Sequence, residues 1–179
     1  MIQFETQNPL YTSRISDRLH FNLSQAFVGT AGGSVCVCRF EPWSSQEHPL
    51  HAAGVNGMAL RSTAEHFELL TAGDDHQVGL AHFACADLQL LSRRQISAHC
   101  SAVRAVLWGH RGVWTLGLDR RLKHWDEQLE LVGEHLCGCQ EPETMAWQGD
   151  QLVLAGRGLE LCRPLGAKMS RSWKAPFRG

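Results

Sequence analysis

The sequence lacks any long hydrophobic run, and its longest apolar stretches fall far short of the roughly 20 residues that span a bilayer. The opening residues, MIQFETQNPLYTSR, include an acidic residue and no apolar segment, so we expect no secretory leader. Without such a leader, the seven cysteines are expected to be free thiols in a reducing compartment. These features predict a cytosolic or nuclear protein, with the cytoplasm as the expected location and no membrane partner.

Motifs of the common catalytic classes are also missing. The chain has no G-x-S-x-G elbow to present a nucleophilic serine. Its glycine clusters, GTAGG (29–33) and AGRG (155–158), match neither the dinucleotide-binding nor the P-loop pattern. No long amphipathic helix is evident, so a Rossmann-like cofactor domain is not expected. The sequence therefore predicts a protein that is not an enzyme and binds no cofactor.

Cysteine and histidine pairs occur, but at spacings that do not suit a metal. CVC (36–38) and CGC (137–139) place two thiols two residues apart, and HPLH (48–51) places two imidazoles three apart. Structural zinc sites use C-x2-4-C spacings with a second matching pair. On a strand, C-x-C points both thiols to one face, where they serve as small core residues. We predict no metal site from these motifs; a metal-dependent enzyme built on them stays as the least favoured alternative.

The composition is that of a soluble globular domain. The chain has 179 residues, 44% of them hydrophobic and 20% charged, which is enough for one domain with its own core. Its formal net charge is −1, but the charges fall in blocks. Residues 88–123 hold seven basic residues and one acidic residue, whereas residues 124–150 hold seven acidic residues and no basic one. Such blocks can form a basic face, although a mixed solvated surface is the favoured explanation.

Four stretches share one plan of short apolar strand, tight turn and second apolar strand. Gly or Asp stands at each turn, which is hairpin chemistry. The stretches are AFVGTAGGSVCVC (26–38), ELLTAGDDHQVGLA (68–81), GVWTLGLDRRLKHW (112–125) and QLVLAGRGLELC (151–162). They recur at intervals of about 40 residues, the length of a four-stranded propeller blade.

A second pattern recurs in register with the first. In blades of this kind a His, a Thr, an Asp and a Trp form a buried hydrogen-bonded chain, because His bridges two partners while the others satisfy the ends. One unit has all four members, and the unit before it has the first three, with Ala81 at the Trp position. These predicted structural residues are His99, Thr115, Asp119 and Trp125, and His51, Thr71 and Asp75. The outer units carry Gly32 and Gly156 at the Asp position, so no such chain is expected there.

The predicted fold is therefore an all-β WD-repeat β-propeller with about four visible blades, expected to be part of a larger propeller. We expect the blades near residues 1–43, 44–92, 93–135 and 136–164. Residues 165–179 are rich in basic and small residues and are predicted to form a basic C-terminal tail that is either disordered or docked against a neighbour.

Several basic residues are candidates for contact with RNA phosphates. Two of them lie in the turn of the third hairpin, near the rim of a blade. The candidates are Arg93, Arg94, Arg120, Arg121 and Lys123. Ordinary surface solubility is the competing explanation and is favoured by composition alone.

Residues 53–83 and 96–125 and the closing LVLAGRGLEL (152–161) resemble the last blades of one WD-repeat family. Members of that family are the non-catalytic partners of the FtsJ-like tRNA ribose 2′-O-methyltransferase. The resemblance covers about residues 50–162 and rests on the order of the motifs, the "AH" before the third unit, the D-x-R-L-x-x-W hairpin and the terminal G-x-G-L-E strand.

The resemblance implies an adaptor role. In the family, the partner enzyme supplies S-adenosylmethionine binding and chemistry, and the propeller directs it to the first anticodon nucleotide. The expected partners are thus an FtsJ-like tRNA methyltransferase subunit and tRNA itself. No RNA-binding residue is carried over, because the basic residues match no family motif. The main alternative is a general protein-interaction propeller, such as a substrate receptor or trafficking scaffold, with no role in RNA modification.

Overall fold

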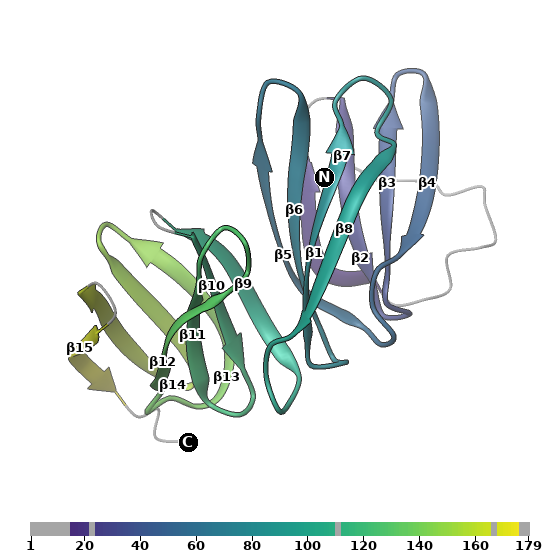
Figure 1. Cartoon of the computed structure of the whole chain (residues 1–179). Helices are drawn as coiled ribbons and strands as arrows, with labels where there is room; N and C mark the ends of the chain where they lie inside the picture. The colour runs from purple at the N-terminus through teal and green to yellow at the C-terminus, as the bar shows by residue number, and fades with distance from the viewer. Residues whose placement is uncertain (1–14, 22–23, 110–111, 166–167, 176–179) are drawn as a thin grey trace, which may run out of the picture.

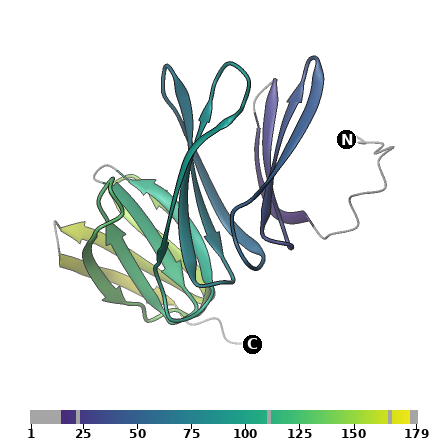
Figure 2. The ribbon, with the colours of Figure 1, turned by 45° about the vertical axis from the view of Figure 1, so that its right-hand side comes forward.

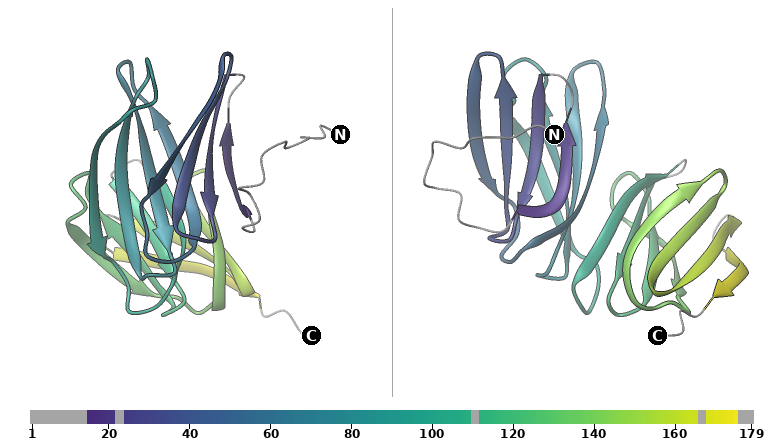
Figure 3. Two further views of the ribbon diagram at one scale, coloured as in Figure 1. Left: turned by 90° about the vertical axis from the view of Figure 1, so that its right-hand side faces the viewer. Right: turned by 180° about the vertical axis from the view of Figure 1, so that it is seen from behind.

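A computed structural model describes residues 15–21, 24–109, 112–165 and 168–175. Within these ranges every regular element is a β-strand, and the strands form four antiparallel sheets that follow one another in chain order (Figures 1 and 3). The described part of the chain contains no helix with the length and apolar character that a membrane crossing requires.

Sheets A and B each have four strands joined by consecutive hairpins. Sheet A comprises β1 (Ile15–Phe21), β2 (Gln25–Thr30), β3 (Ser34–Phe40) and β4 (Trp43–Pro49). Sheet B comprises β5 (Val55–Ser62), β6 (His66–Gly73), β7 (Gln77–Ala84) and β8 (Leu90–Ser97). The strong twist that is usual for antiparallel ribbons is visible in both sheets (Figure 2).

Sheet C repeats this plan and sheet D has three described strands. Sheet C comprises β9 (Val103–Gly109), β10 (Gly112–Gly117), β11 (Arg121–Trp125) and β12 (Leu131–Leu136). Sheet D comprises β13 (Gln140–Gln148), β14 (Gln151–Leu165) and β15 (Lys168–Ala175). The first part of β14 pairs with β13 and its second part pairs with β15.

The first strands of the sheets lie side by side: β5 contacts β1 and β9, and β9 contacts β13. The second strands β2, β6 and β10 are the most buried, β10 along its whole length, whereas the last strands β4, β8 and β12 are mostly exposed. Apolar side chains fill the spaces between sheets, with one cluster between A and B, one between B and C and one between C and D. This is the radial, blade-by-blade packing of a β-propeller.

Two indole hydrogen bonds link neighbouring sheets. Trp108 Nε1 on β9 donates to the carbonyl of Ala59 on β5 at 3.2 Å. Trp147 Nε1 on β13 donates to the carbonyl of Trp108 at 3.0 Å. Both bonds join the first strand of one sheet to the first strand of the sheet before it. They help to fix the distance and register between the first strands of consecutive blades.

The predicted blade boundaries differ from the observed sheets. The divisions at 43/44, 92/93 and 135/136 fall inside β4, β8 and β12. The last strand of each blade is exposed and polar, so it has no hydrophobic alternation from which its extent could be read. Residues 1–14 of the first predicted blade lie outside the described residues.

Of the two alternatives for the predicted tail, the structure shows docking over most of its length and not disorder. Leu165 ends β14, and Lys168–Ala175 forms β15, which pairs with β14 in an antiparallel ladder. The stretch reads KMSRSWKA, with charges at short intervals, as suits an edge strand whose charges discourage further pairing. That composition resembles a disordered tail. Residues 176–179 lie outside the described residues.

Candidate functional site

Four side chains of sheet C and the connection that precedes it form a buried hydrogen-bonded chain. His99 Nε2 lies 2.8 Å from Thr115 Oγ1, and Trp125 Nε1 donates to the same hydroxyl at 2.9 Å. Both carboxylate oxygens of Asp119 lie 3.0 Å from His99 Nδ1. Since the ionised Asp119 can only accept, His99 Nδ1 carries the proton, and Nε2 of the neutral imidazole accepts the hydroxyl proton of Thr115. The hydroxyl oxygen in turn accepts from the indole, which can only donate. The proton order along the chain is thereby set, with a neutral imidazole.

Sheet B holds a shorter version of the same chain. His51 Nε2 lies 2.8 Å from Thr71 Oγ1, and His51 Nδ1 lies 2.8 Å from Asp75 Oδ1. Position 81, which corresponds to Trp125, holds an alanine, and Ala81 packs in the apolar cluster between sheets A and B. The structure thus brings together all seven residues that the sequence singled out as blade residues, in two separate chains.

The two aspartates also hold backbone amides. Asp119 accepts from the amides of Cys100 at 3.2 Å and Arg121 at 3.0 Å. Asp75 accepts from the amide of Ala52 at 2.9 Å in the equivalent place. Each carboxylate therefore ties the connection that enters a sheet to the turn between its second and third strands. This arrangement stiffens the edge of the sheet where those two loops meet.

The protonation states follow from burial and from these partners. Burial lowers the pKa of His99 despite the nearby Asp119 charge. Burial alone would raise the pKa of Asp119, but its interactions with His99 and with the backbone amides lower it. The same balance lowers the pKa of Asp75. The chains therefore hold ionised aspartates, and His99 is a neutral histidine at neutral pH.

Two glycines that the sequence analysis did not single out complete these chains. A Cβ on Gly117 would lie 2.5 Å from His99 Nδ1 and 2.6 Å from Asp119 Oδ1. A Cβ on Gly73 would collide with His51 Nδ1 and Asp75 Oδ1 in the same way. The signal was present as a shared T-x-G-x-D pattern at 71–75 and 115–119.

Sheet D uses a different carboxylate for the same task. Glu160, on β14, is completely buried, and its Oε2 accepts from the amides of Gly138 and Cys139, the latter at 3.0 Å. These residues lie in the connection between β12 and β13. Gly156 stands at the position where sheets B and C have the aspartate. Glu160, four positions later, accepts from the two amides instead. A charged residue inside the alternating apolar run LVLAGRGLELC was the available signal.

Sheet A replaces the chain with a local contact. Thr30 Oγ1 donates to the carbonyl of Ser34 at 3.1 Å and accepts from its amide at 3.2 Å. The turn between β2 and β3 is thus closed by a hydroxyl from its own strand.

The five candidate RNA-contacting residues lie on β8 of sheet B and in the β10–β11 hairpin of sheet C. Arg93 and Arg94, neighbours on β8, reach in different directions. Arg93 Nη1 donates to the carbonyl of Pro49 at 2.8 Å, whereas Arg94 pairs with Glu130 at 2.7 Å. Both contacts join sheet B to an adjacent sheet.

Two of the remaining three are also engaged within the chain. Arg121 pairs with Glu134 at 2.6 Å, and Lys123 Nζ donates to the carbonyl of Ala98 at 2.7 Å. Arg120 lies in the β10–β11 turn with a positive φ of 59°. Four of the five candidates therefore have intramolecular partners, and their contact with RNA stays a prediction.

The thiols are all free. Cys36, Cys137, Cys139 and Cys162 are buried, and Cys100 is exposed. Burial, followed by the charge of Glu160, raises the pKa of the Cys139 thiol. A buried thiol with a raised pKa is a poor nucleophile, so Cys139 is a core residue.

Comparison with solved structures shows the fold. A chain from the structure titled Crystal Structure of Mitotic Checkpoint Complex matches 89% of this chain at 17% sequence identity, with a TM-score of 0.72. The computationally designed Ika8 protein matches 84% at 16% identity, with a TM-score of 0.66. The designed Ika4 protein matches 97% at 18% identity, with a TM-score of 0.67. The chain has a WD-repeat-like β-propeller fold, as the sequence predicted.

The lengths of these structures differ. This chain covers 51% of the checkpoint-complex chain and 46% of Ika8, so it spans about half their length, but it covers 99% of Ika4. No protein-family model matches the sequence, and no curated protein matches it.

Proposed function

We propose that this chain is a non-catalytic WD-repeat scaffold that holds partner macromolecules in a fixed relative orientation. The observation that carries the proposal is the pair of His–Thr–Asp chains in consecutive sheets. Each uses buried polar side chains to fix the loops at one edge of a blade, where propellers commonly present contact residues. A rigid support of this kind suits a protein whose task is positioning.

Exposed apolar side chains support a protein partner. Leu131, Val132 and Leu136 lie on β12, the outer strand of sheet C, with exposed fractions of 51%, 44% and 47%. Apolar residues that gather on an exposed edge strand are typical of protein contact surfaces. We therefore assign partner docking to β12.

For the finer role, we propose support of tRNA wobble-nucleotide ribose 2′-O-methylation in the cytoplasm. The support for it is the resemblance of residues 53–83, 96–125 and 152–161 to the WD-repeat partners of the FtsJ-like methyltransferase. In this role the enzyme subunit binds the methyl donor, and this chain aligns enzyme and tRNA so that the ribose 2′-hydroxyl meets the methyl group. The effect is one of proximity and orientation.

The test is affinity purification of the tagged full chain from its own cells, followed by mass spectrometry. Recovery of an FtsJ-like methyltransferase supports the adaptor role, and its loss in a Leu131→Glu variant supports docking through β12. Leu91→Glu, at an equally exposed position on the outer strand of sheet B, is the matched control. Absence of the methyltransferase from a folded, tagged chain contradicts the finer role.

The internal pairing of four basic residues favours a second candidate, a protein-interaction propeller without an RNA role. The two differ in their response to salt, because each phosphate contact releases counterions and steepens the fall of affinity with salt. We expect tRNA affinity of the scaffold–enzyme complex to fall with salt, and the slope to be shallower with Arg120→Glu. If the salt dependence of tRNA affinity is the same for the wild type and for Arg120→Glu, the second candidate is favoured.

A further inference from the structure

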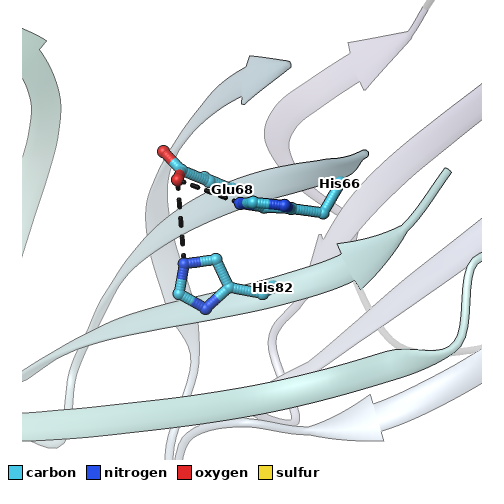
Figure 4. Close-up of side chains that lie close together, drawn as sticks. All are labelled: His66, Glu68 and His82. Atoms are coloured by element: carbon cyan, nitrogen blue, oxygen red, sulfur yellow. Dashed lines mark hydrogen bonds and ion pairs between the residues drawn. The ribbon is translucent and has the colours of Figure 1, made fainter. Parts of the chain in front are cut away.

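A group of three potential metal ligands lies on one face of sheet B, apart from the hydrogen-bonded chains. His66 and Glu68 are two residues apart on β6, and His82 stands directly opposite Glu68 on β7. Alternation along a strand places His66 and Glu68 on the same face, and the pairing adds His82 to it. Figure 4 shows the three side chains pointing toward one another from the two neighbouring strands.

The three side chains converge on one oxygen atom. Glu68 Oε1 lies 3.2 Å from His66 Nε2 and 3.8 Å from His82 Nε2 (Figure 4). The three ligand atoms all lie within 4.8 Å of one another. Ligands at about 2.0 Å from a tetrahedral zinc ion are separated by roughly 3.3 Å, so small side-chain rotations would complete the geometry. The exposed fractions of 30%, 13% and 29% leave the group open to an ion and to water.

Neighbouring side chains orient two of the ligands. His82 Nδ1 lies 2.8 Å from Ser92 Oγ on β8. When Nδ1–H donates to this hydroxyl, Nε2 carries a lone pair, and it then faces the carboxylate oxygen at a distance too long for a hydrogen bond. In that tautomer, a cation between the two electron-pair donors would hold them together. Partners on the second imidazole nitrogen are a regular feature of metal-bound histidines.

The second carboxylate oxygen is fixed by an arginine. Arg61, opposite Glu68 on β5, donates from Nε to Glu68 Oε2 at 2.5 Å. Its guanidinium is held in place because it stacks on Trp108, 3.9 Å from the ring centroid. Arg61 therefore occupies Oε2 and turns Oε1 toward the two imidazoles. Its positive charge lowers the affinity for a dication without blocking the ligand atoms.

We propose that His66, Glu68 and His82 form a binding site for a divalent transition metal ion of the zinc class. Two imidazoles and one carboxylate favour such ions over Mg²⁺ or Ca²⁺, which prefer all-oxygen ligands. Water would complete the coordination. No linear motif encodes the site, since its third ligand comes from the next strand; for that reason the sequence alone predicted no metal.

Another set of potential ligands, His135, Glu160 and Cys162, makes a less suitable site. Oε2 of Glu160 already holds two backbone amides, and Cys162 is fully buried. This set contains a thiol and the proposed site does not. Spectroscopy with Co²⁺ separates the two, because only a cysteine ligand produces a thiolate-to-metal charge-transfer band.

The experiment titrates the full chain with Zn²⁺ against a chromophoric chelator and with Co²⁺ by absorption. We expect one ion per chain, visible Co²⁺ d–d bands and no thiolate charge-transfer band. His66→Ala and His82→Ala should each weaken binding at least tenfold, and Ser92→Ala, which removes only the orienting hydroxyl, about tenfold. Circular dichroism of the metal-free variants confirms that they are folded.

His76→Asn is the matched control. His76 is exposed in the turn at the opposite end of the sheet, and its φ of 68° suits asparagine. We expect this variant to bind Zn²⁺ like the wild type. The proposal is overturned if His66→Ala and His82→Ala bind Zn²⁺ as tightly as His76→Asn, or if Co²⁺ binding is dominated by a thiolate band that both variants retain.

Discussion

Gly117 lies directly against the imidazole of His99, so closely that a Cβ at position 117 would lie 2.5 Å from Nδ1. Gly73 and His51 repeat this contact in the preceding sheet. The two glycines therefore do not serve backbone flexibility. They leave room for the histidine and aspartate of each chain to meet.

Gly117→Ala should destabilise the fold, because the added methyl group would separate His99 from Asp119. Inserting a methyl group into a tightly packed site costs about 1–3 kcal/mol, and the weakened hydrogen bonds add to this. Gly32→Ala is the control, since a Cβ there meets nothing nearer than 3.8 Å, and it should change the free energy of unfolding by less than about 0.5 kcal/mol. Denaturant unfolding measures both; equal stabilities would contradict the assigned role of Gly117.

The hydroxyl of Thr115 should matter more than that of Thr71. Thr115→Val deprives both His99 and Trp125 of a partner, whereas Thr71→Val deprives only His51. Each buried group left without a partner costs about 1–3 kcal/mol, so Thr115→Val should be the more destabilising by about 1 kcal/mol or more. Thr144→Val, at an exposed position, is the control. The measurement is chemical denaturation of the three variants. A larger loss of stability for Thr71→Val than for Thr115→Val would contradict this interpretation.

The sequence predicted the propeller fold and the residues of the blade chains because both depend on local patterns. Alternating apolar strands and turn residues identify hairpins, and the His, Thr and Asp of each unit recur at similar spacings. The same alignment of the units placed Ala81 at the position that corresponds to Trp125. The shared T-x-G-x-D pattern indicates that Gly73 and Gly117 have a common role. That role is steric, so it can be recognised only from the three-dimensional contacts.

Other features depend on which strands pair, and sequence patterns do not encode that. The convergence of His66, Glu68 and His82 follows from the register of β6 against β7. Exposed outer strands carry no buried alternation, so the blade boundaries were misplaced. Intramolecular ion pairs such as Arg94–Glu130 join residues far apart in the chain, so the sequence did not reveal that most of the candidate RNA-contacting residues have partners within the chain.

Acid should destabilise the protein in two steps. Burial lowers the pKa of His99 below its ordinary value of about 6.5. Just below pH 6.5, His99 is therefore protonated in the unfolded chain and still neutral in the folded chain. Stability is therefore present above about pH 6.5 and declines as the pH falls below it. Burial by itself would raise the pKa of Asp119, but its partners lower it, so a further loss follows below about pH 4.

Thermal melting at pH 7.5 and pH 5.5 checks the first step. The wild type should melt at a lower temperature at pH 5.5, and His99→Gln, which cannot titrate, should show a smaller difference. His48, whose pKa burial also lowers, accounts for part of the remainder. A wild type that melts at the same or a higher temperature at pH 5.5 would contradict this first step.

Glu160 should be essential to sheet D although no repeat pattern marks it. Glu160→Ala leaves the amides of Gly138 and Cys139 without their acceptor in a fully buried place, at a cost of about 2–4 kcal/mol. Glu160→Gln keeps an acceptor oxygen and the shape of the side chain, so it should fall between the alanine variant and the wild type. Glu47→Ala, at an exposed position on β4, should be nearly neutral. If Glu160→Ala unfolds at the same denaturant concentration as Glu47→Ala, the carboxylate does not hold the β12–β13 connection, and sheet D must be stabilised by its other contacts with sheet C, namely the apolar cluster and the Trp147–Trp108 hydrogen bond.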